Sequence, residues 1–236
     1  SHLFSTGGLG LSFGSARPIA VAYNRHPILF REKCARLHLC IGATDPEFIE
    51  WNVMLDPHAF VRLLESGLPI ALYPCATDNP FRLGPHNCFW RMPHLEFVRE
   101  MAPPLRRYLG YAIGRLRRVD YLRVLESDLP DEVMQQVYGR NHAVWETAVW
   151  LCLTGRRLVQ RGDTYRIVAE EDVRAADTLL PNELLPCRLH VRPNGTFDYE
   201  LTDGDSNLLL YHRPDPEANQ AALRQALPAW YTSITP

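Results

Sequence analysis

Three short apolar runs in the first third of the chain have the length of buried strands. They cover residues 3–5, 37–41 and 70–73, and segments with helical character separate them. Neighbouring parallel strands need crossover connections of this kind. We therefore expect an α/β fold with a mostly parallel, Rossmann-like sheet flanked by helices.

The helix before the third run carries the clearest local signals. Asp56 and Pro57 are a capping residue and a proline suited to the first helical position. Apolar residues then recur at helical spacing until Gly67, which is a typical residue just past a helix end. The sequence thus predicts a helix directly after Asp56 that ends near Gly67.

The rest of the chain is predicted to alternate helices and strands. Pro93 opens a helical region that Pro103 and Pro104 split into two helices, and another helix covers residues 141–154. A strand follows at residues 164–170.

The tail changes character. Apolar and polar residues alternate on both sides of Asn194–Gly195, which predicts an antiparallel hairpin added to the sheet, and residues 217–234 predict a short amphipathic helix. We assign residues 1–168 to the α/β core and residues 169–236 to a hairpin and helix extension of the same domain.

The beginning of the chain is unusual, because an apolar stretch runs directly into the glycine pair Gly7–Gly8. This pattern predicts a core strand with nothing before it. The N-terminal part of the domain is thus expected to be missing, leaving a sheet edge that a partner or a second copy of the chain would cover.

Composition narrows the function classes. The 236 residues are 46% hydrophobic and carry a formal net charge of −2, which gives no electrostatic reason to expect nucleic acid as a partner. We see no apolar run long enough for a membrane span and no secretory signal, so the default location is the cytoplasm. The six cysteines lack the spacing of a zinc knuckle and are interpreted as buried free thiols, including Cys34 and Cys40, which flank His38.

Polar residues gather where the predicted strands end. Ligands of open α/β sheets bind at the carboxyl ends of the strands. Those ends are predicted at residues 6–8, 42–52 and 75–79, each rich in glycine or polar side chains.

Motifs in this order resemble the inosine-uridine nucleoside hydrolase family. They are Thr6-Gly7-Gly8-Leu9, Glu50-Trp51-Asn52-Val53 with Asp56-Pro57-His58-Ala59, and Trp145-Glu146-Thr147-Ala148. The middle motif is the most specific, since EWNVMLDPHAFVRLLESGLPI reproduces nearly all of the family pattern there. The resemblance extends to about residue 168 and implies a nucleoside-hydrolase-like fold.

The resemblance also implies a chemistry. The family hydrolyses the N-glycosidic bond of ribonucleosides with a calcium-bound water. By position, the Thr6 carbonyl oxygen and Glu146 resemble calcium ligands, while Glu50 and Asn52 resemble the pair that hydrogen-bonds the ribose. Trp145 stands where many members have a histidine that protonates the leaving base; an indole cannot do so but can stack on a base.

The chain also departs from the family pattern. The acidic segment that supplies most calcium ligands and the general base does not occur in it, and residues 10–17 are an apparent insertion. In the loop before Glu50, Thr44 or Asp45 stands in place of a substrate-binding asparagine. We therefore assign no catalytic residue, consider the Ca²⁺ site incomplete, and expect no family-like hydrolysis by this chain alone.

Simpler interpretations of the same residues stay open. Glu50 is also explained as an ion-pair partner, Asn52 as a turn former, and Glu146 as an i,i+4 partner of His142 on one helix. The chain is accordingly an enzyme completed by another segment, a non-catalytic module that binds a nucleoside or a ribose-like molecule, or a structural module that binds neither.

Overall fold

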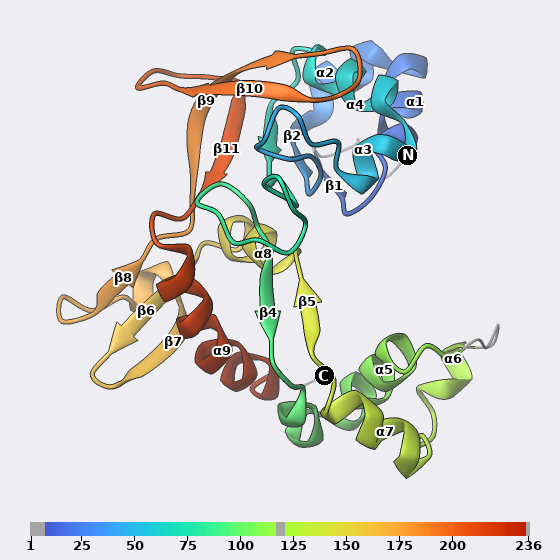
Figure 1. Ribbon diagram of the computed structural model, residues 1–236, viewed down its shortest axis with the longest axis vertical. Helices are drawn as coiled ribbons and strands as arrows, with labels where there is room; N and C mark the ends of the chain where they lie inside the picture. The colour runs from blue at the N-terminus through green and yellow to red at the C-terminus, as the bar shows by residue number, and fades with distance from the viewer. Residues whose placement is uncertain (1–7, 117–120, 235–236) are drawn as a thin grey trace. The chain divides into compact units, whose positions relative to one another are not determined.

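The computed structural model describes residues 8–116 and 121–234 (Figure 1). Contacts divide the chain into two compact units. Unit 1 comprises residues 1–90, 145–156 and 181–217, and unit 2 comprises residues 91–144, 157–180 and 218–236. These two units are defined by packing and do not test the predicted division of the chain at residue 168, which stays a prediction.

Unit 1 is built on a six-stranded mixed sheet. The strand order is β1 (Gly8–Ser12), β2 (Cys34–Leu39), β3 (Ile70–Leu72), β11 (Leu208–His212), β9 (Glu183–Val191) and β10 (Phe197–Leu201). The pairs β1/β2, β2/β3 and β3/β11 are parallel, whereas β11/β9 and β9/β10 are antiparallel. The expected α/β sheet with an antiparallel addition is therefore present.

Helices cover both faces of this sheet. They are α1 (Arg17–Arg25), α2 (Pro27–Lys33), α3 (Trp51–Leu55), α4 (Pro57–Leu64) and α8 (Thr147–Leu153). Along β3, Ile70 and Leu72 pack in a core with side chains of α1, α2 and α4, while Ala71 packs in a second core with α8. The alternation of side chains along a strand explains why one short strand contributes to both cores.

The local signals around α4 and the hairpin are confirmed. The Asp56 side chain accepts a hydrogen bond from the Ala59 backbone N–H at 3.1 Å, and Gly67 has a φ of 74°. In the hairpin, Gly195 has a φ of 84° and Phe197 pairs with Val191. Both glycines occupy the left-handed region that other residues adopt at a cost.

The start of the sheet differs from the prediction. The predicted strand at residues 3–5 lies outside the described residues, and Gly8, predicted at a strand end, begins strand β1 opposite Cys34, the first residue of β2. The carboxyl end of β1 is at Ser12, which pairs with Leu39. Gly10 serves close packing, because a Cβ there would lie 2.6 Å from Leu37 Cδ2. The turn predicted at Gly7–Gly8 is wrong at Gly8, which belongs to β1.

Unit 2 combines small sheets with helices. Its strands are β4 (Trp90–Met92) paired with β5 (His142–Val144), and β7 (Thr164–Ala169), β6 (Arg156–Arg161) and β8 (Thr178–Leu180) in that order. Its helices are η2 (Glu96–Glu100), α5 (Pro103–Ile113), α6 (Tyr121–Val124), α7 (Asp131–Tyr138), η3 (Glu170–Asp172) and α9 (Pro216–Thr232). The predicted strand near residue 164 is β7, and the final helix is α9.

Two helix predictions in this region need correction. The helix predicted at residues 141–154 is helical only in α8, because β5 takes up the residues before it. The region opened by Pro93 forms a 3-10 helix before α5 begins at Pro103, as the proline pair predicted. Over residues 8–116 and 121–234, we find no helix with the length and apolarity needed to cross a membrane.

The Asp56 cap gives a stability prediction. Asp56→Ala removes both the bond to Ala59 and the ion pair with Arg17, so we expect a loss of about 1–2 kcal/mol in unfolding free energy. Arg17→Ala removes only the largely exposed ion pair and should cost about 0.5 kcal/mol or less. Urea unfolding of both variants measures the difference; equal losses would show that the cap contributes nothing.

Candidate functional site

A pocket of about 290 Å³ lies at the carboxyl ends of the first three strands, within unit 1. Phe13 follows β1, Cys40 follows β2 and Cys75 lies three residues beyond β3, and all three line the pocket. Glu50 and Asn52 enter from the start of α3, and Trp145 and Glu146 from the segment before α8. The structure thus brings together four residues that the sequence singled out.

Glu50 is the buried polar centre of this pocket, with 5% of its surface exposed. Its Oε2 accepts a hydrogen bond from the Gly42 backbone N–H at 3.1 Å, and its Oε1 accepts one from Asn52 Nδ2 at 3.0 Å. Burial raises the pKa of the carboxyl group, although the N–H groups of Asn52 and Gly42 oppose this shift. The partners of Glu50 are thus amides, which disfavours its interpretation as an ion-pair residue.

The loop between Gly42 and Glu50 is held by its own backbone. Gly42 has a φ of 96°, and a Cβ there would lie 3.2 Å from a Phe197 ring atom. Thr44 Oγ1 donates to the Ala76 carbonyl oxygen at 3.5 Å, and Asp45 accepts from the Glu47 N–H at 2.8 Å. Thr44 and Asp45 therefore shape the loop and are not among the residues that line the pocket.

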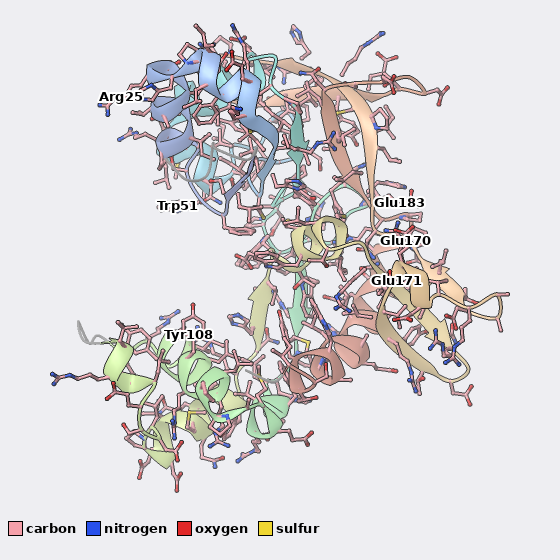
Figure 2. The ribbon with its side chains drawn as sticks, turned by 180° about the vertical axis from the view of Figure 1, so that it is seen from behind. Arg25, Trp51, Tyr108, Glu170, Glu171 and Glu183 are labelled. Carbon is pink, nitrogen blue, oxygen red and sulfur yellow. The ribbon has the colours of Figure 1, made fainter. Side chains whose placement is uncertain are left out.

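Aromatic side chains also line the pocket. Trp145 Nε1 donates to the Cys75 carbonyl oxygen at 2.9 Å, which fixes the indole plane. Its ring lies 6.3 Å from that of Phe81, which is 56% exposed, and 5.4 Å from that of Phe89. Trp51, labelled in Figure 2, is 64% exposed at the pocket. Exposed rings beside a buried polar centre can hold a flat apolar or heteroaromatic group.

Glu146 supplies the second carboxylate. Its Oε2 accepts a hydrogen bond from the Trp145 backbone N–H at 3.3 Å. His142 lies in strand β5, so the two residues are not one turn apart on a helix, and the i,i+4 interpretation is wrong. Glu146 lines the pocket from the segment before α8.

The donor set of the described residues does not fit calcium. Ca²⁺ takes six to eight oxygen ligands. The described lining offers two carboxylates, one already bound by two N–H groups, together with the Asn52 amide and the sulfur atoms of Cys40 and Cys75. Thr6, the predicted carbonyl ligand, lies outside the described residues. We derive no chemical step through this ion.

Sequence reasoning missed the pocket residues Phe13, Cys40, Cys75 and Phe81. Cys40 lies inside the predicted strand at residues 37–41 and Cys75 lies in the predicted strand end at residues 75–79, and those positions were the available signal. The cysteines are free, and five of the six are buried, as predicted, while Cys152 is partly exposed. Cys34 packs in the core beneath α1 and α2, apart from the core that contains Cys40.

Comparisons with known proteins give little beyond this geometry. The sequence matches no protein-family model and no curated protein. A solved structure, the inosine-uridine preferring nucleoside hydrolase from Bacillus anthracis, is 15% identical, with a TM-score of 0.37 over 93% of this chain. The match spans 59% of the hydrolase chain. Because this similarity is low, the fold is described from the strand order and strand registers of the chain itself.

The burial of Glu50 predicts a pH effect on stability. Because burial raises its pKa above the usual 4.5, the folded protein holds this proton more tightly than the unfolded chain. The contribution of the Glu50 carboxyl group to the stability of the fold is fully present below its usual pKa. This contribution is lost as pH rises through the raised pKa of the folded protein. We expect Glu50→Gln to gain stability relative to the wild type as pH rises above the usual pKa of 4.5.

Urea unfolding of the two proteins across this pH range measures the effect. Glu47→Gln is the matched control, since it removes an exposed carboxylate from the same loop. A difference between Glu50→Gln and wild type that stays constant or shrinks as pH rises would contradict the assignment.

Proposed function

We propose that this pocket binds the ribose of a ribonucleoside, and that the described residues hold this ligand without hydrolysing it. The observation that carries the proposal is the Glu50–Asn52 pair, a buried carboxylate and an amide joined by a 3.0 Å hydrogen bond in a pocket with aromatic lining. The motif resemblance noted above implies the same role for these two residues.

The chemistry of Glu50 suits a sugar diol. Each carboxylate oxygen accepts one N–H and has a second acceptor site, so the group can still take hydrogen bonds from hydroxyl donors. A hydrogen bond to a charged group contributes about 1.5–3 kcal/mol, or roughly a 10- to 100-fold gain in affinity. A ligand hydroxyl would also compensate the buried charge, which has only amide partners in the described residues.

The aromatic lining suits the base. Trp145 is fixed by its bond to Cys75, and Phe81 and Trp51 present exposed ring surface. A ring held in one orientation loses little entropy when a base stacks on it. The volume of about 290 Å³ lies near the lower bound of about 300 Å³ for ligand pockets, which favours a ligand of nucleoside size over a dinucleotide.

The proposal assigns no hydrolytic step to the described lining. Hydrolysis requires an activated water and assistance to the departing base. We assign Glu50 to the ribose and no chemical step to Glu146, and the Trp145 indole cannot act as an acid near neutral pH. An enzyme completed by another segment and a structural module remain the competing functions, and the test below separates them.

The test is nucleoside binding by calorimetry, with ribonucleosides compared with their 2′-deoxy forms. We expect the deoxy forms to bind about 10-fold more weakly or worse, and Asn52→Ala to abolish most of that preference. Glu47→Gln, in the same loop but outside the pocket lining, is the matched control and should bind as the wild type.

Ribose release is measured in parallel, with calcium and with a chelator. Absence of nucleoside binding would contradict the proposal in favour of a structural role. Calcium-dependent turnover that Glu50→Ala abolishes would contradict the non-catalytic part and identify a hydrolase.

A further inference from the structure

Three cysteine side chains, two of which line the pocket, converge within unit 1. Cys40 Sγ lies 3.7 Å from Cys75 Sγ and 3.5 Å from Cys88 Sγ, and all three sulfur atoms lie within 4.8 Å of one another. All three residues are buried. They come from separate segments of unit 1, so their convergence is a tertiary feature that the spacing along the sequence does not reveal.

Backbone hydrogen bonds fix the position of each cysteine. The Cys40 N–H donates to the Ser12 carbonyl oxygen at 2.9 Å, and the Cys75 N–H donates to that of Gly42 at 2.8 Å. The Cys88 N–H donates to the Pro74 carbonyl oxygen at 2.8 Å. The cluster is thus built on strand ends and is held in place before any ligand binds.

The sulfur spacing fits a tetrahedral thiolate site. A Zn–S bond of about 2.3 Å places two sulfur ligands of a tetrahedron about 3.8 Å apart. The observed separations of 3.7 Å and 3.5 Å from Cys40 lie close to that value. A disulfide needs about 2.05 Å, so pairing two of these sulfurs would require a larger shift.

We propose that Cys40, Cys75 and Cys88 bind a zinc ion through three thiolates, with the fourth position open to the pocket. Cys40 and Cys75 line the pocket, whereas Cys88 is not among its lining residues, so the open side of the cluster is the pocket side. Structural zinc sites close with four protein ligands, while an open position leaves room for water or a bound molecule.

A buried arginine next to the cluster favours this charge arrangement. Arg213 is 1% exposed, and its guanidinium donates to the carbonyl oxygens of Gly84 and Phe89 and to the Asn87 side-chain oxygen. These acceptors are neutral, and two of them flank Cys88. Three thiolates with Zn²⁺ carry a net charge of −1, which the Arg213 cation offsets; with Cu⁺ the net charge would be −2.

Binding requires that the thiols lose their protons. One Zn²⁺ and three thiols give a zinc tris-thiolate and three released protons, with no change of oxidation state. Because binding releases these protons, the zinc affinity of the cluster should increase with pH.

Titration of the reduced, metal-free full chain with Zn²⁺ and with Co²⁺ tests this site, without any nucleoside present. We expect one ion per chain and a thiolate-to-cobalt charge-transfer absorption. Cys88→Ser should weaken binding at least about 100-fold, beyond the 10- to 100-fold cost of losing an outer-shell partner. Cys187→Ser is the matched control, because Cys187 is buried in the other core and should leave binding unchanged.

Circular dichroism of each variant checks the fold, and Cys75→Ala provides a second variant should Cys88→Ser unfold. The proposal is overturned by stoichiometric metal binding that the cluster variants retain, by no binding at micromolar metal, or by oxidation to a Cys40–Cys75 disulfide in place of metal uptake. None of these outcomes bears on nucleoside binding, so failure here is distinct from failure of the proposed function.

Discussion

The site depends on the backbone of Gly42, which joins two strand ends through hydrogen bonds of both its N–H and its carbonyl group. Its N–H donates to Glu50, and its carbonyl oxygen accepts from the backbone N–H groups of Cys75 and Ala76 at 2.8 and 3.3 Å. One residue thereby ties the end of β2 to the segment after β3 and positions the buried carboxylate. Only a residue that tolerates a φ of 96° can bond in both directions here, and Phe197 and Phe60 leave little space for a side chain.

Two chemically different sets of ligand-binding groups therefore lie at the same strand ends. The carboxylate and amide of Glu50 and Asn52 are hard oxygen and nitrogen groups suited to hydroxyls, while the Cys40 cluster offers soft sulfur ligands. The polar pair costs stability in the free protein, because a buried carboxylate with amide partners is less well solvated than in water. Such a cost is expected of a ligand site, where binding offsets it, and is harder to explain in a purely structural module.

Local signals in the sequence predicted the elements that local chemistry determines. Asp56 and Pro57 marked the start of α4, and Asn194–Gly195 marked the hairpin, because caps and tight turns depend on neighbouring residues. The turn predicted at Gly7–Gly8 was wrong at Gly8, because Gly8 pairs with Cys34 of a strand that is distant in the sequence. The cysteine cluster was missed for the same reason, as Cys40 and Cys88 are 48 residues apart. The pocket residues at Glu50 and Glu146 were found through motif resemblance, and the structure shows them lining one pocket.

A crystal structure of the chain grown with a saturating ribonucleoside would decide whether the Glu50–Asn52 pair is a ribose site. We predict ribose hydroxyl oxygens within about 2.6–3.2 Å of the Glu50 carboxylate, with the base against the Trp145 indole and the Gly42 bond retained. A nucleoside bound elsewhere, or a pocket that holds none while Glu50 keeps only its bonds to Gly42 and Asn52, would contradict the assignment.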